Sequence, residues 1–324
     1  MTLTKAAEII FKQNMNVQPN ESVLIVTDEI KREIAKAFYD IGLELGLDMS
    51  MIEMKSRKVN GEEPPKSIFG ALLTSSVALL ITDKSLSHTT ARREASKAGT
   101  RIASMPGITQ EMLSRMINTD TNSINEKCNS IAEALKGANE ILIKSKAGTE
   151  IKMSLVNMEV EVDNGMLHNK GDFGNLPAGE VCFAPNRGTS QGIFVIDASM
   201  ASVGKVTTPI KITVDKGFAD KIEGGEEAKQ LQEHLDSLKS QYCFNIAELG
   251  IGCNEFAIVS GKVLEDEKVY GTAHIALGDN TSFGGDVKAP CHLDGVFHMP
   301  TILVDGRMIM KDGEYQAIGL EEYD

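Results

Sequence analysis

The chain of 324 residues has no tryptophan, and aromatic side chains make up only 5% of it. It has five cysteines, an odd number, and no two of them form a CxxC pair. Neither a disulfide framework nor a thiolate zinc cluster is therefore expected. No apolar run approaches the roughly 18 residues that a membrane-spanning helix needs, and the first residues lack the basic and apolar segments of a signal peptide. We therefore expect a cytoplasmic protein with no membrane partner.

Basic residues are fewer than acidic ones. Lysine plus arginine number 33 against 46 aspartates and glutamates, which gives a formal net charge of −13. Binding to a nucleic-acid backbone depends on a basic surface, so nucleic acid is not an expected partner. The acidic excess has two interpretations: a solvated surface, which is the more common case, or carboxylates buried around a cation.

Phosphate-binding and serine-hydrolase motifs are also missing. No GxGxxG follows the first predicted strand, and neither GxxxxGK[ST] nor GxSxG occurs in the chain. Dinucleotide binding, triphosphate binding and the usual serine hydrolase chemistry are therefore disfavoured.

The first 139 residues alternate between apolar strands and helical patterns. The expected strands are 22–27, 49–54, 77–82 and 101–104. Continuous apolar runs separated by helices are typical of a parallel sheet with right-handed crossovers. We therefore predict a Rossmann-like α/β domain over residues 1–139.

From residue 140 onwards the pattern changes to short strands and turns, with a single helix expected at 225–239. A two-residue hairpin turn is expected at Asp305-Gly306, and one of the strands is predicted at 257–260. We therefore predict a β-rich α+β domain over residues 140–324 that carries the metal and the catalytic residues.

Five ionisable residues of this second half lie in apolar surroundings: Glu180, Glu248, His274, His292 and Asp294. Burying a lone carboxylate costs several kcal/mol unless it is paired or binds a metal. His292 and Asp294 form a His-x-Asp pair, whose side chains share one face of a strand. Each residue alone is better explained as a core histidine or a solvated glutamate. Together they predict a divalent metal site for zinc, cobalt, manganese or ferrous iron, in which bridging carboxylates make two ions feasible.

At these residues the chain resembles the aminopeptidase T/aminopeptidase S group of leucyl aminopeptidase-like metallo-exopeptidases. Five sequence segments show the resemblance: Gly174-Asn-Leu-Pro-Ala-Gly-Glu180-Val, Asn245-Ile-Ala-Glu248-Leu-Gly-Ile-Gly, Leu264-Glu-Asp-Glu-Lys268, Gly271-Thr-Ala-His274-Ile-Ala-Leu-Gly and His292-Leu-Asp294. The resemblance implies an α/β domain followed by a β-rich domain, a dinuclear metal site held by the five residues above, and a homodimer.

One position departs from the peptidase pattern. The peptidases of this group carry a tyrosine seven positions after the first ligand histidine, and here that position is Thr281. The same superfamily includes an iron-dependent dihydroxypyridine dioxygenase with a two-histidine, one-carboxylate site. His274, His292 and Asp294 would satisfy that requirement too.

Two enzymatic hypotheses follow. The main one is an aminopeptidase in which a metal-activated water attacks the first peptide bond, with Glu180 or Glu248 as ligand or general base. The alternative is a ferrous dioxygenase that cleaves a hydroxylated N-heteroaromatic ring. His88 and Thr281 are the predicted substrate-binding residues, because His88 follows the carboxyl end of the third strand, although a histidine that merely starts a helix is the simpler explanation. A non-enzymatic metal-stabilised binding protein is a third possibility.

Overall fold

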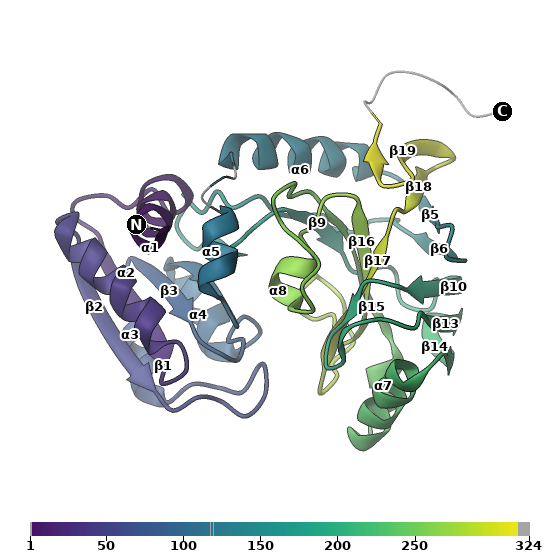
Figure 1. The fold of residues 1–324 in the computed structure, drawn as a ribbon, viewed down its shortest axis with the longest axis horizontal. Helices are drawn as coiled ribbons and strands as arrows, with labels where there is room; N and C mark the ends of the chain where they lie inside the picture. Colours follow the sequence, from purple (N-terminus) through teal and green to yellow (C-terminus); the bar gives the residue numbers. More distant parts are fainter. Residues whose placement is uncertain (1, 117, 119, 317–324) are drawn as a thin grey trace. The chain divides into compact units, whose positions relative to one another are not determined.

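The computed structural model describes residues 2–116, 118 and 120–316 of the chain. The chain divides into two compact units: unit 1 comprises Met1–Asn125 and Asp163–Ala178, and unit 2 comprises Glu126–Val162 and Gly179–Asp324. Figure 1 shows the helices and strands of both units in sequence colours. The predicted functional domains 1–139 and 140–324 stay predictions. The prediction did not include the return of residues 163–178 to unit 1.

Unit 1 is built around a parallel sheet of five strands in the order β2-β1-β3-β4-β8 among the described residues. Its strands are β1 (Ser22–Asp28), β2 (Asp48–Met54), β3 (Val77–Ile81), β4 (Arg101–Ser104) and β8 (Phe173–Asn175). Its helical elements are α1 (Thr2–Ile9), the π-helix η1 (Ile10–Asn14), α2 (Arg32–Glu44), α3 (Lys66–Thr74), α4 (Thr90–Ala98) and α5 (Gln110–Met116). Helix α6 (Thr121–Leu135) begins in unit 1 and ends in unit 2.

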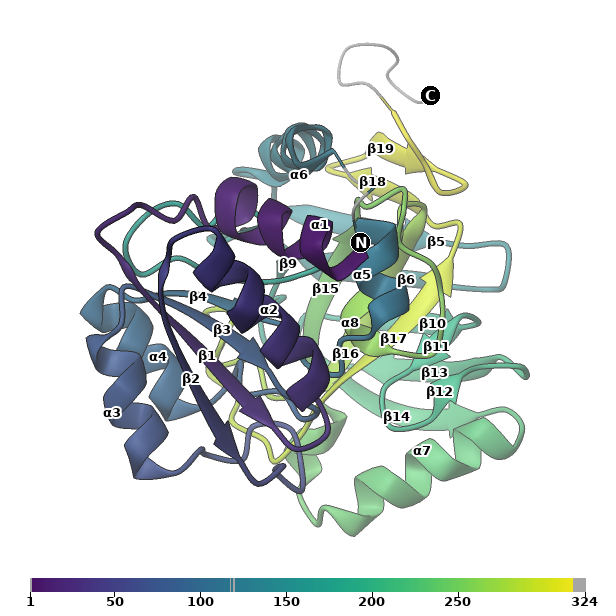
Figure 2. The same ribbon diagram turned by 60° about the vertical axis from the view of Figure 1, so that its left-hand side comes forward.

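The central strands of unit 1 are apolar because helices cover both faces of the sheet. Figure 2 shows α3 and α4 on one face, with α1 and α2 on the other. The core on the α3 and α4 side consists of Leu24, Val26, Met54, Ile68, Leu72, Ala78, Leu80, Leu86, Ala91, Ala95 and Ile102. On the other side, the rings of Phe11 and Phe38 pack edge to face, with their centroids 6.2 Å apart. Each fully buried aliphatic or aromatic side chain stabilises the folded state by about 1.5–3 kcal/mol relative to an exposed one. The predicted α/β fold class is confirmed.

In its described residues, unit 2 contains two sheets of mainly antiparallel strands. The strands of the eight-stranded sheet, in spatial order, are β14 (Phe218–Glu223), β13 (Ile210–Asp215), β10 (Gln191–Ile196), β6 (Glu150–Ser154), β5 (Glu140–Lys144), β18 (Thr301–Val304), β19 (Arg307–Lys311) and β20 (Glu314–Tyr315). The strands of the seven-stranded sheet are β12 (Gly204–Lys205), β11 (Ser199–Met200), β17 (His292–His298), β16 (Thr272–Gly278), β15 (Ile246–Gly252), β9 (Glu180–Phe183) and β7 (Glu161–Asp163). The helical elements are α7 (Glu226–Ser237), the 3₁₀-helix η2 (Gln241–Phe244) and α8 (Val263–Asp266).

Two local predictions for unit 2 had opposite outcomes. The Asp305-Gly306 hairpin is confirmed: both residues have positive φ angles, 48° and 81°, and join β18 to β19. The strand predicted at 257–260 is wrong. The backbone N–H groups of Ser260 and Gly261 instead donate to the carboxylate of Asp266, the last residue of α8, at 2.6 and 2.9 Å.

Within the residues that the structure describes, no helix has the length and apolar character needed to cross a membrane.

Candidate metal centre

The five residues predicted as metal ligands come from four neighbouring strands of one sheet. Glu180 lies on β9, Glu248 on β15, His274 on β16, and His292 and Asp294 on β17. The ladder pairs β9 with β15, β15 with β16, and β16 with β17, all antiparallel. Directly opposite residues share a face and alternate residues return to it. This register places all five side chains on the same face of the sheet.

Small residues occupy the ligand face between these side chains. Glu180 lies opposite Gly252, His274 opposite Gly250, and His292 opposite Gly278. A Cβ atom at Gly250 would lie only 2.1 Å from Cε1 of His274. The His274 imidazole therefore fits only because residue 250 has no side chain.

A β-bulge in β15 lies directly before Glu248, which shares this face with Gly250 and Gly252. Ile246 pairs with Leu277, whereas Glu248 pairs with Ala276, and the register shifts between them at Ala247. In a regular strand residues 246 and 248 would point to the same side. The extra residue places the apolar Ile246 side chain on the opposite face.

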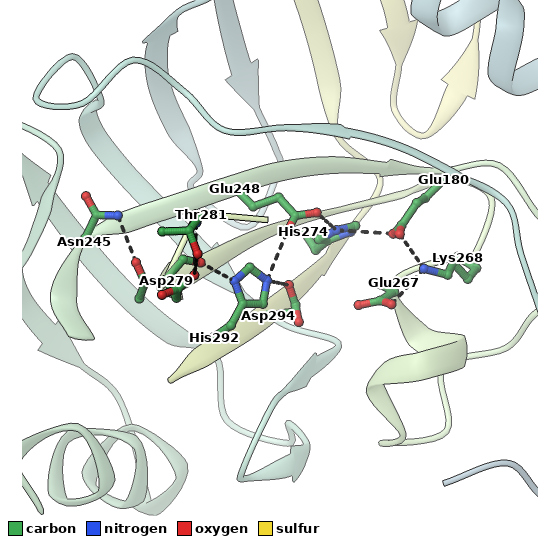
Figure 3. A network of polar contacts seen from close by, with 11 residues as sticks. Glu180, Asn245, Glu248, Glu267, Lys268, His274, Asp279, Thr281, His292 and Asp294 are labelled. Carbon is green, nitrogen blue, oxygen red and sulfur yellow. Dashed lines mark hydrogen bonds and ion pairs between the residues drawn. The ribbon is translucent and has the colours of Figure 1, made fainter. Parts of the chain in front are cut away.

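His292 is held by contacts at both ring nitrogens. Its Nδ1 lies 2.7 Å from the backbone carbonyl oxygen of Asp279, so this nitrogen carries the proton and donates. Its Nε2 lies 2.9 Å from Glu248 Oε2 and 3.2 Å from Asp294 Oδ1. Figure 3 shows the ring between these partners. Outer contacts of this kind fix the tautomer and orientation of metal-binding histidines.

His274 is fully buried, and its polar atoms lack good partners. Its Nε2 lies 3.5 Å from Glu180 Oε2 and 3.5 Å from Glu248 Oε1, too far for a good hydrogen bond. Among the described residues, neither ring nitrogen nor Glu180 Oε2 has a hydrogen-bond partner. Leaving such atoms buried and unpaired costs about 1–3 kcal/mol each. A cation bound by His274 Nε2 and Glu180 Oε2 would satisfy these two atoms.

The pKa values of the ionisable groups in the centre reflect this concentration of charge. Burial lowers the pKa of His274, but the carboxylates of Glu248, Glu180 and Asp294 outweigh burial and raise it to about 9. Burial would raise the pKa of Glu248, yet the two imidazoles hold it well below its usual range. The pKa of Asp294 is likewise lowered, because His292 outweighs the effect of burial. Glu248 and Asp294 are therefore ionised, as metal ligands must be.

Two further residues belong to the centre that the sequence analysis did not select, Glu267 and Lys268. The Lys268 Nζ donates to Glu180 Oε1 at 2.5 Å and to Glu267 Oε1 at 2.8 Å. Burial raises the pKa of Glu267 well above its usual value, and the neighbouring ammonium acts in the opposite direction. Both residues belong to a run of four consecutive charged residues, 265–268, and such a run usually indicates an exposed segment. All four side chains are buried here.

The ionisable atoms form two adjacent groups. Glu180, Glu267 and His274 make one group, and Glu248, His292 and Asp294 make the other. Within each group the potential ligand atoms lie within 4.8 Å of one another. Nitrogen and oxygen donors in this combination suit ferrous iron, manganese or zinc. The residues therefore fit a divalent metal, and their individual roles as ligands stay predictions.

The two predicted substrate-binding residues lie in different units. Thr281 is exposed in the loop after β16, where its hydroxyl donates to Asp279 Oδ1 at 2.7 Å. His88 belongs to unit 1, directly before Thr89, the N-cap of α4. The Thr89 hydroxyl caps that helix by accepting from the Arg92 N–H at 3.2 Å. A substrate-binding role stays a prediction for both His88 and Thr281.

Comparison with known protein families matches residues 3–317 to the family described as NicX: 2,5-dihydroxypyridine 5,6-dioxygenase. The chain belongs to this dioxygenase family. A relative named 2,5-dihydroxypyridine 5,6-dioxygenase, from Pseudomonas putida KT2440, is 26% identical over 256 residues, which span 74% of this chain and 71% of the relative.

Two solved structures share the fold of this NicX-family chain. The 2,5-dihydroxypyridine dioxygenase from Pseudomonas putida KT2440 superposes with a TM-score of 0.86, at 21% identity and over 97% of each chain. Wild-type AmpT from Thermus thermophilus superposes with a TM-score of 0.68, at 15% identity, over 97% of this chain and 98% of that chain.

The predicted aminopeptidase activity, with its hydrolase chemistry and peptide substrate, is wrong. The family match and the curated relative both indicate a dioxygenase, which was the alternative hypothesis. The likeness of this chain to AmpT concerns the fold alone. The threonine at the peptidase tyrosine position, Thr281, was the residue in the sequence that pointed away from peptidases.

Proposed function

We propose that this chain is a ferrous-iron-dependent dioxygenase that opens the ring of a dihydroxylated pyridine. The observation that carries the proposal is a two-histidine, one-carboxylate set, His274, His292 and Asp294, on one sheet face of a NicX-family chain. Such a set is the common ligand arrangement of non-haem ferrous oxygenases. When bound, ferrous iron supplies the one-electron chemistry that dioxygen needs to react with an organic ring.

The side chains of the centre prepare this chemistry by orientation and burial. The hydrogen bond from His292 to the Asp279 carbonyl leaves Nε2 as the nitrogen that faces the other ligands. His274 and Glu248 are 0% and 3% exposed, which limits water in the centre. Glu248 has a lowered pKa and stays ionised. It is therefore better suited to hold the metal or orient the imidazoles than to act as the general base.

The name of the curated relative suggests the substrate, 2,5-dihydroxypyridine, and the bond that is cleaved, between carbons 5 and 6. We propose the same substrate class for this chain, a small planar ring with two hydroxyl groups. The predicted homodimer, the cytoplasmic location and the substrate-binding role of His88 stay predictions.

Oxygen uptake tests this function. Metal-free protein is loaded with ferrous iron under anaerobic conditions, and 2,5-dihydroxypyridine is then added in an oxygen electrode. We expect one dioxygen consumed per ring, together with loss of the ultraviolet absorbance of the ring. Zinc-loaded protein is the control and should consume no oxygen. If iron-loaded protein leaves 2,5-dihydroxypyridine and its dihydroxylated isomers intact, the proposal is wrong.

A further inference from the structure

The loop between β16 and β17, residues 279–291, contains one phenylalanine and no tyrosine. The ring of this residue, Phe283, lies against the imidazole of His292, with the centroids 5.2 Å apart and the ring planes tilted by 31°. Aromatic rings in favourable contact have centroids about 4.5–7 Å apart. Phe283 therefore packs on a predicted metal ligand, although it has no donor atom that could bind the metal itself.

Hydrogen bonds around Asn280 fix the backbone that carries this ring. Asn280 is 1% exposed, and its side-chain Oδ1 accepts from the Val287 N–H at 2.8 Å. The Asn280 carbonyl oxygen accepts from the N–H groups of Phe283 and Gly285, at 3.1 and 3.0 Å. A Cβ atom at Gly285 would lie 2.1 Å from Asn280 Cγ, so the loop is closely packed at this point. A loop that is already fixed lowers the entropy lost when a ligand binds against it.

The ligand face of the sheet offers little apolar surface to an aromatic substrate. Its side chains are carboxylates and imidazoles, and the positions between them are small, as at Gly250, Ala276 and Gly278. A dihydroxylated ring is polar at its edge, where the hydroxyl groups lie, and apolar on both faces. Sites for such molecules combine a few polar groups with apolar or aromatic walls. Phe283 is half-buried and contacts the centre through His292, so it can supply a flat apolar wall there.

We propose that Phe283 is a substrate-binding residue whose ring stacks on the planar ring of the substrate. This inference rests on the proposed function, because it takes the substrate to be a small hydroxylated aromatic ring. Polar groups that bind hydroxyls do not by themselves distinguish a flat ring from a saturated one, whereas stacking requires a π face. Phe283 therefore selects for a flat ring, while the polar groups of the centre bind its hydroxylated edge.

Isothermal titration calorimetry of zinc-loaded protein with 2,5-dihydroxypyridine tests this role without turnover. We expect Phe283→Leu to raise the dissociation constant about tenfold, and Phe283→Tyr to stay within about twofold of the wild type, because stacking of rings on aromatic side chains has effects of this size. Bound zinc should be equal in all three proteins. Phe69→Leu is the matched control. Phe69 is a partly buried phenylalanine on α3 of unit 1, and its variant should bind the ring like the wild type.

Each other outcome counts against the proposal. An unchanged dissociation constant in Phe283→Leu, or an equal loss in Phe283→Tyr, would overturn it. Loss of zinc from Phe283→Leu would overturn it too, because the ring would then serve to position His292. If the wild type binds no 2,5-dihydroxypyridine, the proposed substrate class fails together with this inference. If the wild type and Phe283→Leu bind the ring equally well, only this inference fails.

Nuclear magnetic resonance provides a second measurement in case Phe283→Leu does not fold. Zinc-loaded wild type with isotope-labelled phenylalanine should show nuclear Overhauser contacts between the ring protons of bound 2,5-dihydroxypyridine and a phenylalanine ring. In Phe283→Tyr, labelled only at phenylalanine, these contacts should disappear. Contacts that are missing in the wild type, or that persist in Phe283→Tyr, contradict the assignment of Phe283.

Discussion

At the residue scale, the geometry of the centre depends on contacts that orient each ligand side chain. His292 is the clearest case, because the Asp279 carbonyl fixes one ring nitrogen and the Phe283 ring lies beside it with centroids 5.2 Å apart. The His-x-Asp spacing predicted that His292 and Asp294 share a face. The spacing could not predict the hydrogen bond from His292 to the backbone carbonyl of Asp279, thirteen residues earlier. Such a contact depends on where the intervening loop lies in the folded chain.

Asp294→Asn should weaken iron binding and activity together. The amide has the same shape but lacks the charge that offsets a divalent ion and pairs with His292. We expect bound iron and oxygen uptake with 2,5-dihydroxypyridine to fall by about 100-fold, a typical size for losses around metal sites. Iron content and initial uptake rates measure the effect. Asp220→Asn, at an exposed position on β14, should leave both unchanged. Wild-type iron content in Asp294→Asn would show that Asp294 is not a ligand.

Gly250→Ala should disturb the centre without replacing a predicted ligand. The new Cβ would overlap the His274 ring, at 2.1 Å from Cε1. Overpacking of this kind costs about 1–3 kcal/mol, and we expect lower metal affinity as well as a lower free energy of unfolding. Urea unfolding and metal titration are the measurements. Gly70→Ala is the matched control: residue 70 is exposed in α3, with nothing within 4 Å of the new atom. Alanine should stabilise that helix by about 0.5–1 kcal/mol. Equal effects of the two changes would contradict the packing argument.

At the scale of elements, strand register decides which residues form the centre. The alternating α/β pattern, the β-rich second half and the Asp305-Gly306 hairpin could be predicted because local periodicity and turn chemistry encode them. The bulge at Ala247 could not, because it appears only when β15 pairs with β16. Glu267 and Lys268 were missed for a similar reason, since a run of charges resembles an exposed segment until its tertiary partners are known.

Glu21 and Arg101 join the start of β1 to the start of β4 in unit 1. The Arg101 side chain is 6% exposed, and its Nη1 and Nη2 donate to the two Glu21 oxygens at 2.9 and 2.7 Å. Partial burial raises the pKa of Glu21, but the bonds from Arg101 and Gln18 outweigh it, so the net shift is downward. A lowered folded-state pKa adds stability above the unfolded pKa near 4.5, and this stability is lost as the pH falls through the folded value.

Glu21→Gln should therefore destabilise the protein at neutral pH and much less in acid. We expect a loss of about 1–3 kcal/mol at pH 7, because the buried guanidinium loses its charged partner. The difference from wild type should shrink below about pH 4, where the wild-type carboxyl is itself becoming protonated. Urea unfolding at several pH values measures this. Glu133→Gln, on the exposed face of α6, should change stability by less than about 0.5 kcal/mol. A loss that is independent of pH would contradict the ion-pair explanation.

At the scale of the whole molecule, every predicted ligand belongs to unit 2, although the chain has two units. A metal that binds only the folded state stabilises it by about 2.7 kcal/mol when its concentration is 100 times the dissociation constant. Since the predicted ligands lie on β9, β15, β16 and β17, the stabilisation by the metal should be largest in that sheet.

Metal removal should thus affect the two units unequally. We expect a chelator to increase amide hydrogen exchange in peptides that contain the four ligand strands, while peptides from β1 and β3 of unit 1 change little. Hydrogen exchange with mass spectrometry, with and without Mn²⁺, resolves the difference. Equal deprotection of both units, or none in the ligand strands, would argue against a metal centre in unit 2.

The glycines of the ligand face also restrict how the chemistry of this scaffold can diverge. A Cβ at Gly252 or Gly278 would approach a neighbouring carbonyl oxygen to 2.1 Å, and one at Gly250 would meet the His274 ring. Selection can therefore introduce few new donors on these strands without moving the backbone. Ala276, opposite both Glu248 and Asp294, already carries a Cβ atom. A lineage that acquires a new reaction on this sheet would start from that position or from the loops at its edge.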